Sequence, residues 1–156
     1  MKKSYGLDYI FQNKMTLIEL QAEVKTDLKL QPDELNFEAV RTPEIHNKYN
    51  KMLMSERLAL KKLEREWDVL YLEKWEYYRK KADPEVYKEK PLLKKIMEED
   101  VKKYLPADSD LQALRGQIES KEELIDFLKR VMDQVAQRTW LIRNAIDYLK
   151  YLGGEK

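Results

Sequence analysis

The sequence of 156 residues has no cysteine, four glycines, five prolines and one histidine. Without cysteine it has no disulfide framework, no zinc finger and no thiol nucleophile. The scarcity of glycine and proline argues against a turn-rich β-sandwich. No apolar run approaches the roughly 18 residues that span a membrane, and Asp8 and Gln12 interrupt the start before a signal-peptide core could form. These absences predict a soluble, helical protein.

Groups suited to catalysis are also scarce. His46 is the only imidazole, and a lone histidine early in a helix is more often a surface residue than a catalytic base. No glycine-rich turn follows a strand, so there is no nucleotide fingerprint. Glu98, Glu99 and Asp100 are consecutive, and adjacent carboxylates on a helix point in different directions. We therefore predict that the chain is not an enzyme and holds no metal or cofactor.

The sequence is instead rich in charge of both signs. Charged residues make up 38%, and 30 Lys and Arg against 29 Asp and Glu leave a net charge of +1. A net charge this close to zero gives no indication of a nucleic-acid partner. Abundant Lys, Glu, Leu and Ala are typical of long helices, which predicts an all-α fold with an elongated subunit.

Capping residues and prolines mark the expected helices. Thr16 with Glu19 is a capping box, which predicts a helix that Pro32 ends. We expect a short helix over residues 33–41. Thr42 followed by Pro43 is typical of a helix start, so the longest helix is expected from there to about residue 82. Pro91 predicts a further helix to about residue 105.

The last predicted helix carries a heptad pattern. Asp108 or Ser109 would cap it, and Gly153 with Gly154 would end it. From Ile125 onward its apolar positions alternate by three and four residues, a 3.5-residue period that keeps one side facing a partner only if the helix supercoils. We predict that this seam joins copies of the chain in an oligomeric bundle or ring, and the alternative is packing within its own subunit. The seam consists of Ile125, Leu128, Met132, Val135, Thr139, Ile142, Ile146 and Leu149.

Basic and aromatic residues interleave over residues 57–95. Lysines and arginines hold phosphates, and bases of a single strand stack on aromatic rings without regard to sequence. The alternative is an ordinary solvated helix whose rings are core. By helical geometry Trp67 lies in the middle of the apolar face and is assigned to packing, whereas Trp75 lies on its flank. The predicted DNA-binding residues are Lys61, Lys62, Arg65, Lys74, Trp75, Arg79, Lys80 and Lys81.

Lys74 is unusual, because it falls near the centre of the apolar face, where a leucine would be expected. A buried, unpaired ammonium is costly. Three explanations remain open: the side chain snorkels to solvent, it pairs with an acid from another helix, or it faces a groove that binds an anion.

From Met15 to Gly154 the sequence resembles the UvsY-type recombination mediator proteins of large tailed bacteriophages. The resemblance rests on the order and spacing of four segments, and residues 1–14 lie outside it. The segments are Leu17–Asp27 (LIELQAEVKTD), Leu35–Ala39 (LNFEA), Leu72–Tyr78 (LEKWEYY) and the helical end Ala145–Gly153.

The resemblance implies a homo-oligomeric ring, a hexamer or heptamer, that binds single-stranded DNA in the cytoplasm of the infected bacterial host. It also implies contacts with a RecA-like recombinase and with a single-strand-binding protein. In this role the chain would help the recombinase to replace the single-strand-binding protein on the DNA. Residues 1–14 would be a flexible extension, residues 15–106 the DNA-binding region and residues 107–156 the oligomerisation helix.

The family's DNA-contacting motif reads Leu-Lys-Ala-Arg-Leu before an acid and two tyrosines. Here it falls on residues 71–75, so that Lys74 matches its arginine while Leu72 replaces its lysine. The match favours the anion-binding explanation of Lys74. Cations that could compensate for Leu72 are Arg79, Lys80 and Lys81.

A function of another class also fits the composition. Near-zero net charge would suit a helical oligomeric adaptor or scaffold that binds only proteins. DNA affinity at low salt separates this alternative from a DNA-binding mediator.

Overall fold

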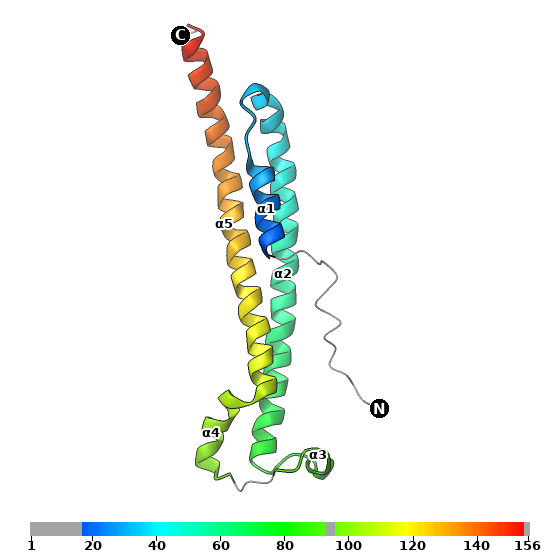
Figure 1. The fold of residues 1–156 in the computed structure, drawn as a ribbon. Helices are drawn as coiled ribbons and strands as arrows, with labels where there is room; N and C mark the ends of the chain where they lie inside the picture. Colours follow the sequence, from blue (N-terminus) through cyan, green and yellow to red (C-terminus); the bar gives the residue numbers. More distant parts are fainter. Residues whose placement is uncertain (1–16, 93–95, 155–156) are drawn as a thin grey trace. The chain divides into compact units, whose positions relative to one another are not determined.

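The structure is a computed structural model that describes residues 17–92 and 96–154 (Figure 1). Every regular element in these residues is a helix or helical turn, which confirms the predicted all-α fold. None of the helices described is long and apolar enough to cross a membrane. The predicted extension over residues 1–14 lies outside the described residues. The helices are α1 (Leu17–Leu28), α2 (Leu35–Tyr78), α3 (Pro84–Glu89), α4 (Val101–Tyr104) and α5 (Ser109–Leu152), with 3-10 turns at Pro32–Glu34, Glu98–Asp100 and Leu105–Ala107.

The described residues form two compact units. The first unit comprises residues 17–50 and 130–154, and the second comprises residues 51–92 and 96–129. Within each unit α2 and α5 run antiparallel, so each of these 44-residue helices contributes to both units. The units therefore cut across the predicted segments 15–106 and 107–156, whose functional assignment stays a prediction.

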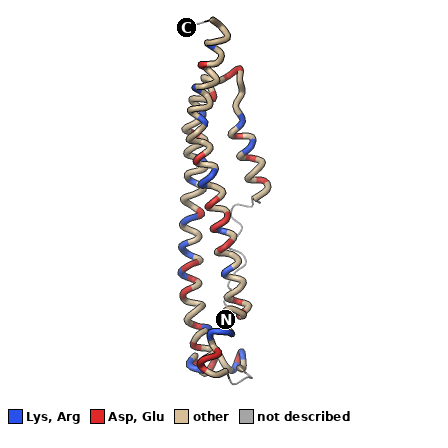
Figure 2. Tube along the Cα trace, turned by 90° about the vertical axis from the view of Figure 1, so that its left-hand side faces the viewer, with Lys and Arg blue, Asp and Glu red and all other residues tan. Residues whose placement is uncertain are grey.

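Charged residues of both signs are interspersed along the long helices (Figure 2). This distribution agrees with solvated helix faces of mixed charge, so any cationic site must be found from individual residues.

The core of the first unit joins three helices. The 12-residue α1 is too short to be stable by itself in water, so it depends on packing against α2 and α5. Buried apolar residues in this unit are Leu20 and Val24 of α1, Leu35, Ile45 and Tyr49 of α2, and Val131, Val135 and Ile142 of α5.

A buried ion pair crosses this core. Arg138 is 2% exposed and Glu38 is 1% exposed, and their side chains form an ion pair. The Arg138 guanidinium also donates to the main-chain oxygen of Leu28 at 2.8 Å, and its Nε donates to Thr42 Oγ1 at 3.2 Å. The last carbonyls of a helix lack partners within that helix. Arg138 therefore caps α1 and links it to α2 and α5.

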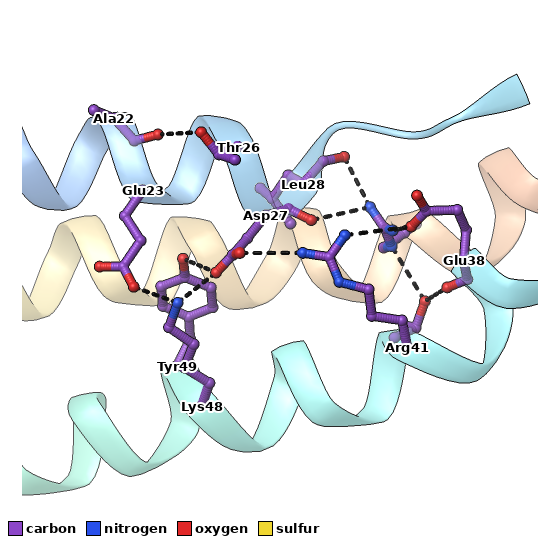
Figure 3. A network of polar contacts seen from close by, with 11 residues as sticks. Ala22, Glu23, Thr26, Asp27, Leu28, Glu38, Arg41, Lys48 and Tyr49 are labelled. Atoms are coloured by element: carbon purple, nitrogen blue, oxygen red, sulfur yellow. Dashed lines mark hydrogen bonds and ion pairs between the residues drawn. The ribbon is translucent and has the colours of Figure 1, made fainter. Parts of the chain in front are cut away.

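Asp27 extends this polar network to the surface (Figure 3). Its carboxylate accepts hydrogen bonds from Lys48 Nζ at 2.5 Å, Tyr49 Oη at 2.9 Å and Arg41 at 3.2 Å. Burial would raise the pKa of Asp27, but the hydrogen bonds from Lys48 and Tyr49 outweigh it and lower that pKa. Lys48 also pairs with Glu23 at 2.5 Å, so the polar face of α1 is tied to α2.

Pro43 lies inside α2, so the prediction of separate helices over residues 33–41 and 42–82 is wrong. Proline lacks an N–H and crowds the preceding turn. Glu38 and Ile45, on either side of it, are both buried in the same core, and a break at Pro43 would turn one of them away. The Thr42 hydroxyl donates to the Glu38 carbonyl at 2.9 Å and braces the turn before the proline.

The helix predicted from Pro91 to residue 105 is also wrong for the residues described there. The backbone is extended at Met97, with ψ of 150°, and helical turns begin only at Glu98. Three consecutive acids from Glu98 suit a helix N-terminus, where the helix dipole is positive. Met97 is exposed, whereas Val101 and Leu105 are buried. The three- and four-residue spacing of apolar residues in this segment therefore does not correspond to one continuous helix.

Candidate nucleic-acid interface

The end of α2 packs against the start of α5 in the second unit. Val101, Leu105 and Leu111 form a buried cluster. Trp67 packs against this cluster, in keeping with its central place on the apolar face, and Trp75 contacts it as well. This core therefore holds in place the end of α2, where several of the predicted DNA-binding residues lie.

Asp108 caps α5, as the sequence predicts. Its Oδ1 accepts hydrogen bonds from the main-chain N–H of Asp110 at 3.0 Å and of Leu111 at 3.2 Å. Its Oδ2 accepts a hydrogen bond from Tyr78 Oη at 2.9 Å and lies 2.9 Å from Lys74 Nζ. Burial would raise the pKa of Asp108, but the hydrogen bonds from Lys74 and Tyr78 outweigh it and lower that pKa. The cap of α5 is thus also an anchor for α2.

Lys74 pairs with two carboxylates at the start of α5. Its Nζ lies 2.9 Å from Asp108 Oδ2 and 2.5 Å from Asp110 Oδ2. Burial alone would lower the pKa of Lys74, but hydrogen bonds to Asp110 and Asp108 outweigh burial and raise it. Of the three explanations open from sequence, pairing with an acid from another helix is the one found in the structure.

Arg79 and Trp75 form a second contact. The Arg79 guanidinium carbon lies 4.1 Å from the centroid of the Trp75 ring, a cation–π arrangement, and the guanidinium also pairs with Glu98. Trp75 lines a shallow apolar depression together with Tyr71 and Leu72. The two aromatic rings of this depression are of the kind on which a base can stack.

The tyrosines near Trp75 have structural contacts that the sequence did not reveal. Tyr87 Oη accepts from the Ala82 N–H at 3.1 Å and donates to the Tyr77 carbonyl at 3.0 Å. The rings of Tyr77 and Tyr87 stack at 5.5 Å between centroids. Burial and the hydrogen bond to Asp108 raise the pKa of Tyr78 to about 12. These rings therefore stabilise the end of α2 and are engaged with protein groups.

Lys80 terminates α2 in a left-handed conformation, with φ of 57°. The Lys81 N–H donates to the Glu76 carbonyl at 2.9 Å and the Lys80 N–H donates to the Tyr77 carbonyl at 3.1 Å. This pattern closes many helices, usually with glycine at the position of Lys80. It ends α2 at Tyr78, before the predicted end near residue 82.

Replacing Lys80 by glycine is expected to raise the free energy of unfolding by about 0.5–1 kcal/mol. Glycine adopts positive φ without the clash of a Cβ atom, and the greater entropy of the unfolded chain offsets part of the gain. Urea denaturation followed by circular dichroism measures the change. Lys81→Gly is the matched control and should give no gain, since Lys81 has no positive φ. Equal effects of the two variants would contradict the assignment of strain to Lys80.

The remaining predicted cations are exposed. Lys61, Lys62 and Arg65 lie on the surface of α2, and Lys80 and Lys81 follow its end. Lys62 lies 3.9 Å from Glu66, and Arg65 Nε donates to the Lys61 carbonyl at 3.1 Å. The eight predicted residues thus all belong to the second unit, but they divide into these exposed cations and the engaged side chains of Lys74, Trp75 and Arg79.

The predicted oligomerisation seam is also divided. Ile125, Leu128, Val135 and Ile142 are buried within the single chain, which agrees with the alternative of packing inside the subunit. Met132 and Ile146 are half-buried, whereas Thr139 and Leu149 are exposed. In the first unit the last turns of α5 continue past the connection between α1 and α2 (Figure 1). Beside the seam there, a partly exposed row at heptad spacing consists of Leu141, Ala145, Tyr148 and Leu152.

Comparison with known proteins gives matches of two kinds. The family described as "Recombination, repair and ssDNA binding protein UvsY" matches residues 23–155. Crystal structures of the bacteriophage T4 recombination mediator protein UvsY share the fold. The lattice type II structure has a TM-score of 0.79 at 21% identity and covers 89% of this chain and 98% of that chain.

Two further lattices of the same T4 protein agree. Type I gives a TM-score of 0.76 at 20% identity, covering 85% of this chain, and type IV gives 0.74 at 21% identity, covering 88%; both cover 98% of the T4 chain. No curated protein sequence matches the chain. The family match extends over most of the sequence and the structures show the same fold. The chain therefore belongs to the UvsY family of recombination, repair and single-stranded-DNA-binding proteins.

Proposed function

We propose that this chain is a recombination mediator that binds single-stranded DNA as a homo-oligomer. In this role it promotes loading of a RecA-like recombinase onto DNA covered by single-strand-binding protein. The observation that carries the proposal is the family match over residues 23–155. The second unit supplies side chains whose chemistry suits such a strand.

Phosphates would be held by the exposed cations on and after α2. From Lys61 to Tyr78 the helix advances roughly 25 Å at 1.5 Å per residue, a length along which an extended strand can run. A base would stack on the aromatic rings of the depression lined by Tyr71, Leu72 and Trp75, because aromatic rings stack with any base. Binding of this kind is independent of sequence, which suits a protein that acts on any single strand.

Assembly would multiply these weak sites. The exposed row on the last turns of α5 has the spacing that lets copies of the helix pack together. When several copies hold one strand, each further contact is intramolecular and the overall affinity rises steeply. Long single strands would then bind much more tightly than short ones.

Loading would follow from how the strand is held. A strand bound along several subunits is kept extended, which weakens its contacts with a competing single-strand-binding protein and presents its bases to a RecA-like recombinase. Both proteins are proposed partners, together with further copies of the chain in a hexameric or heptameric ring.

The test is fluorescence anisotropy of a labelled oligo(dT) titrated with the full chain at low and moderate salt. Replacing Lys61, Lys62 and Arg65 together by glutamine is expected to weaken binding by about tenfold at low salt. The salt dependence should become flatter, because each lost phosphate contact removes about 0.7 from the slope for single strands.

The matched control removes three exposed cations of the first unit and should leave affinity nearly unchanged. An equal loss in both triple variants would show that net charge, and not the proposed interface, determines binding. The control substitutions are Lys25→Gln, Lys29→Gln and Arg143→Gln.

The adaptor alternative draws on exposed apolar residues of α2. Met54, Leu58 and Val69 face solvent, and such residues can contact a protein partner. If the chain does not bind oligonucleotides even at low salt, that result would favour this alternative over DNA binding.

A further inference from the structure

In the second unit, two lysine ammonium groups lie near the same exposed carboxylate, that of Asp110. Asp110 Oδ2 lies 2.5 Å from Lys74 Nζ and 3.7 Å from Lys90 Nζ. We propose that these two ammonium groups form a phosphate site for single-stranded DNA and that Asp110 is its internal competitor when DNA is absent. This inference rests on the proposed function and adds Lys90 and Asp110 to the interface.

The geometry at Asp110 suits a phosphate oxygen. One carboxylate oxygen lies within 3.7 Å of ammonium groups from two different segments, α2 and the residue after α3. A phosphate oxygen makes the same charge-assisted contacts. The site also adjoins the first turn of α5, where the helix dipole favours a negative charge. The contacts that Asp110 makes are therefore contacts that a backbone phosphate could take over.

The exposure of the two neighbouring acids separates their roles. Asp108 is 7% exposed and accepts hydrogen bonds from Tyr78 and from two N–H groups of α5, so it stays in place. The Asp110 side chain is 48% exposed. The Lys74 side chain is 15% exposed, so the pair is open to solvent on its Asp110 side, where an incoming anion can compete with the carboxylate. Lys74 thus has one permanent partner and one exchangeable partner.

The charge balance explains why Asp110 would oppose binding. With Asp110 in place, the ammonium groups of Lys74 and Lys90 are matched by the carboxylates of Asp108 and Asp110. Once Asp110 is displaced or neutralised, one positive charge is left at the site. This positive charge attracts a phosphate, whereas the cluster with Asp110 in place has no net charge to attract it.

The experiment replaces Asp110 by asparagine, which keeps the shape of the side chain and removes its charge. Affinity of the full chain for labelled oligo(dT) at low salt should rise about two- to fivefold, the range expected for removing a competing exposed ion pair. The salt slope should steepen by about 0.7 for each phosphate newly bound. Asp110→Ser should give the same gain, and thermal melting checks that both variants fold.

Two further variants test the site itself. Glu122→Gln removes an exposed acid from the same helix and unit, and it should change affinity much less than Asp110→Asn. Lys90→Ala should cancel part of the gain in the Asp110→Asn background, yet change little in the wild-type chain, where Asp110 already balances Lys90.

The outcomes separate the inference from the proposed function. A wild-type chain without affinity for oligo(dT) would end the proposed function. A wild-type chain that binds, with Asp110→Asn no tighter than Glu122→Gln, would overturn only the competitor role of Asp110. A gain that survives unchanged in the Lys90→Ala background would overturn the two-ammonium site.

Discussion

Replacing Arg138 by methionine is expected to lower the free energy of unfolding by about 3 kcal/mol. The variant leaves the Glu38 carboxylate, 1% exposed, without its buried partner, and breaking one half of a buried pair costs about 3–5 kcal/mol. The loss should fall at the lower end, because an Arg41 guanidinium nitrogen lies 3.7 Å from the same carboxylate. The cap on the Leu28 carbonyl is lost as well. Urea denaturation at neutral pH measures the effect.

Two controls identify the cause of that loss. Arg143→Met removes an exposed arginine of α5 and should change stability by less than about 0.5 kcal/mol. The double variant Arg138→Met with Glu38→Leu should recover about half of the loss, since no buried charge is left unpaired. A double variant as unstable as Arg138→Met would mean that packing around Arg138, and not the charge of Glu38, accounts for its role.

Substituting Tyr148 and Leu152 together by glutamate is expected to abolish assembly and to weaken binding to long oligonucleotides by about 100-fold. Both side chains are exposed on the last turns of α5, so the subunit should keep its fold while the row between copies becomes charged. Loss of multivalency removes a factor of about 10² or more. Light scattering gives the mass in solution, and anisotropy with long and short oligonucleotides gives the two affinities.

Lys150→Glu is the matched control for this variant. It changes the net charge by the same amount as the two glutamates, and Lys150 lies on the other flank of the buried stripe of α5. The control should remain assembled and keep its preference for long strands. A Tyr148 and Leu152 variant of unchanged mass would show that this row does not join the copies.

Point substitutions are better suited to this question than deletion of the helix. A chain ending near Ser120 would lose Val131, Val135 and Arg138, which are buried in the first unit. Such a chain would lose the core of that unit together with any interface. Charged residues on the exposed row change the surface and leave the core intact.

Features that depend on neighbouring residues could be predicted from the sequence. Asp108 caps α5 through N–H groups two and three residues ahead. Gly154 closes α5 with φ of 77° and donates to the Tyr151 carbonyl at 3.2 Å. The all-α fold follows from the same kind of local signal. The family resemblance likewise rested on the order of short segments, and the family match confirms it.

Features that depend on distant partners could not be predicted. Periodicity gives the face on which Lys74 lies, but not that Asp108 and Asp110 lie opposite it. Likewise nothing near Arg138 in the sequence indicates its pairing with Glu38, 100 residues away.

The heptad of α5 shows the same limit. A 3.5-residue spacing fits a helix packed inside its subunit and a helix packed between copies equally well, because both bury one stripe. In the tertiary structure Ile125, Leu128, Val135 and Ile142 are buried within the single chain, and their role between copies stays a prediction. The sequence by itself determined the all-α class, the start and end of α5 and the apolar stripe that α5 carries. Only the tertiary structure decided what each stripe and each charge contacts, since those contacts come from residues far away in the chain.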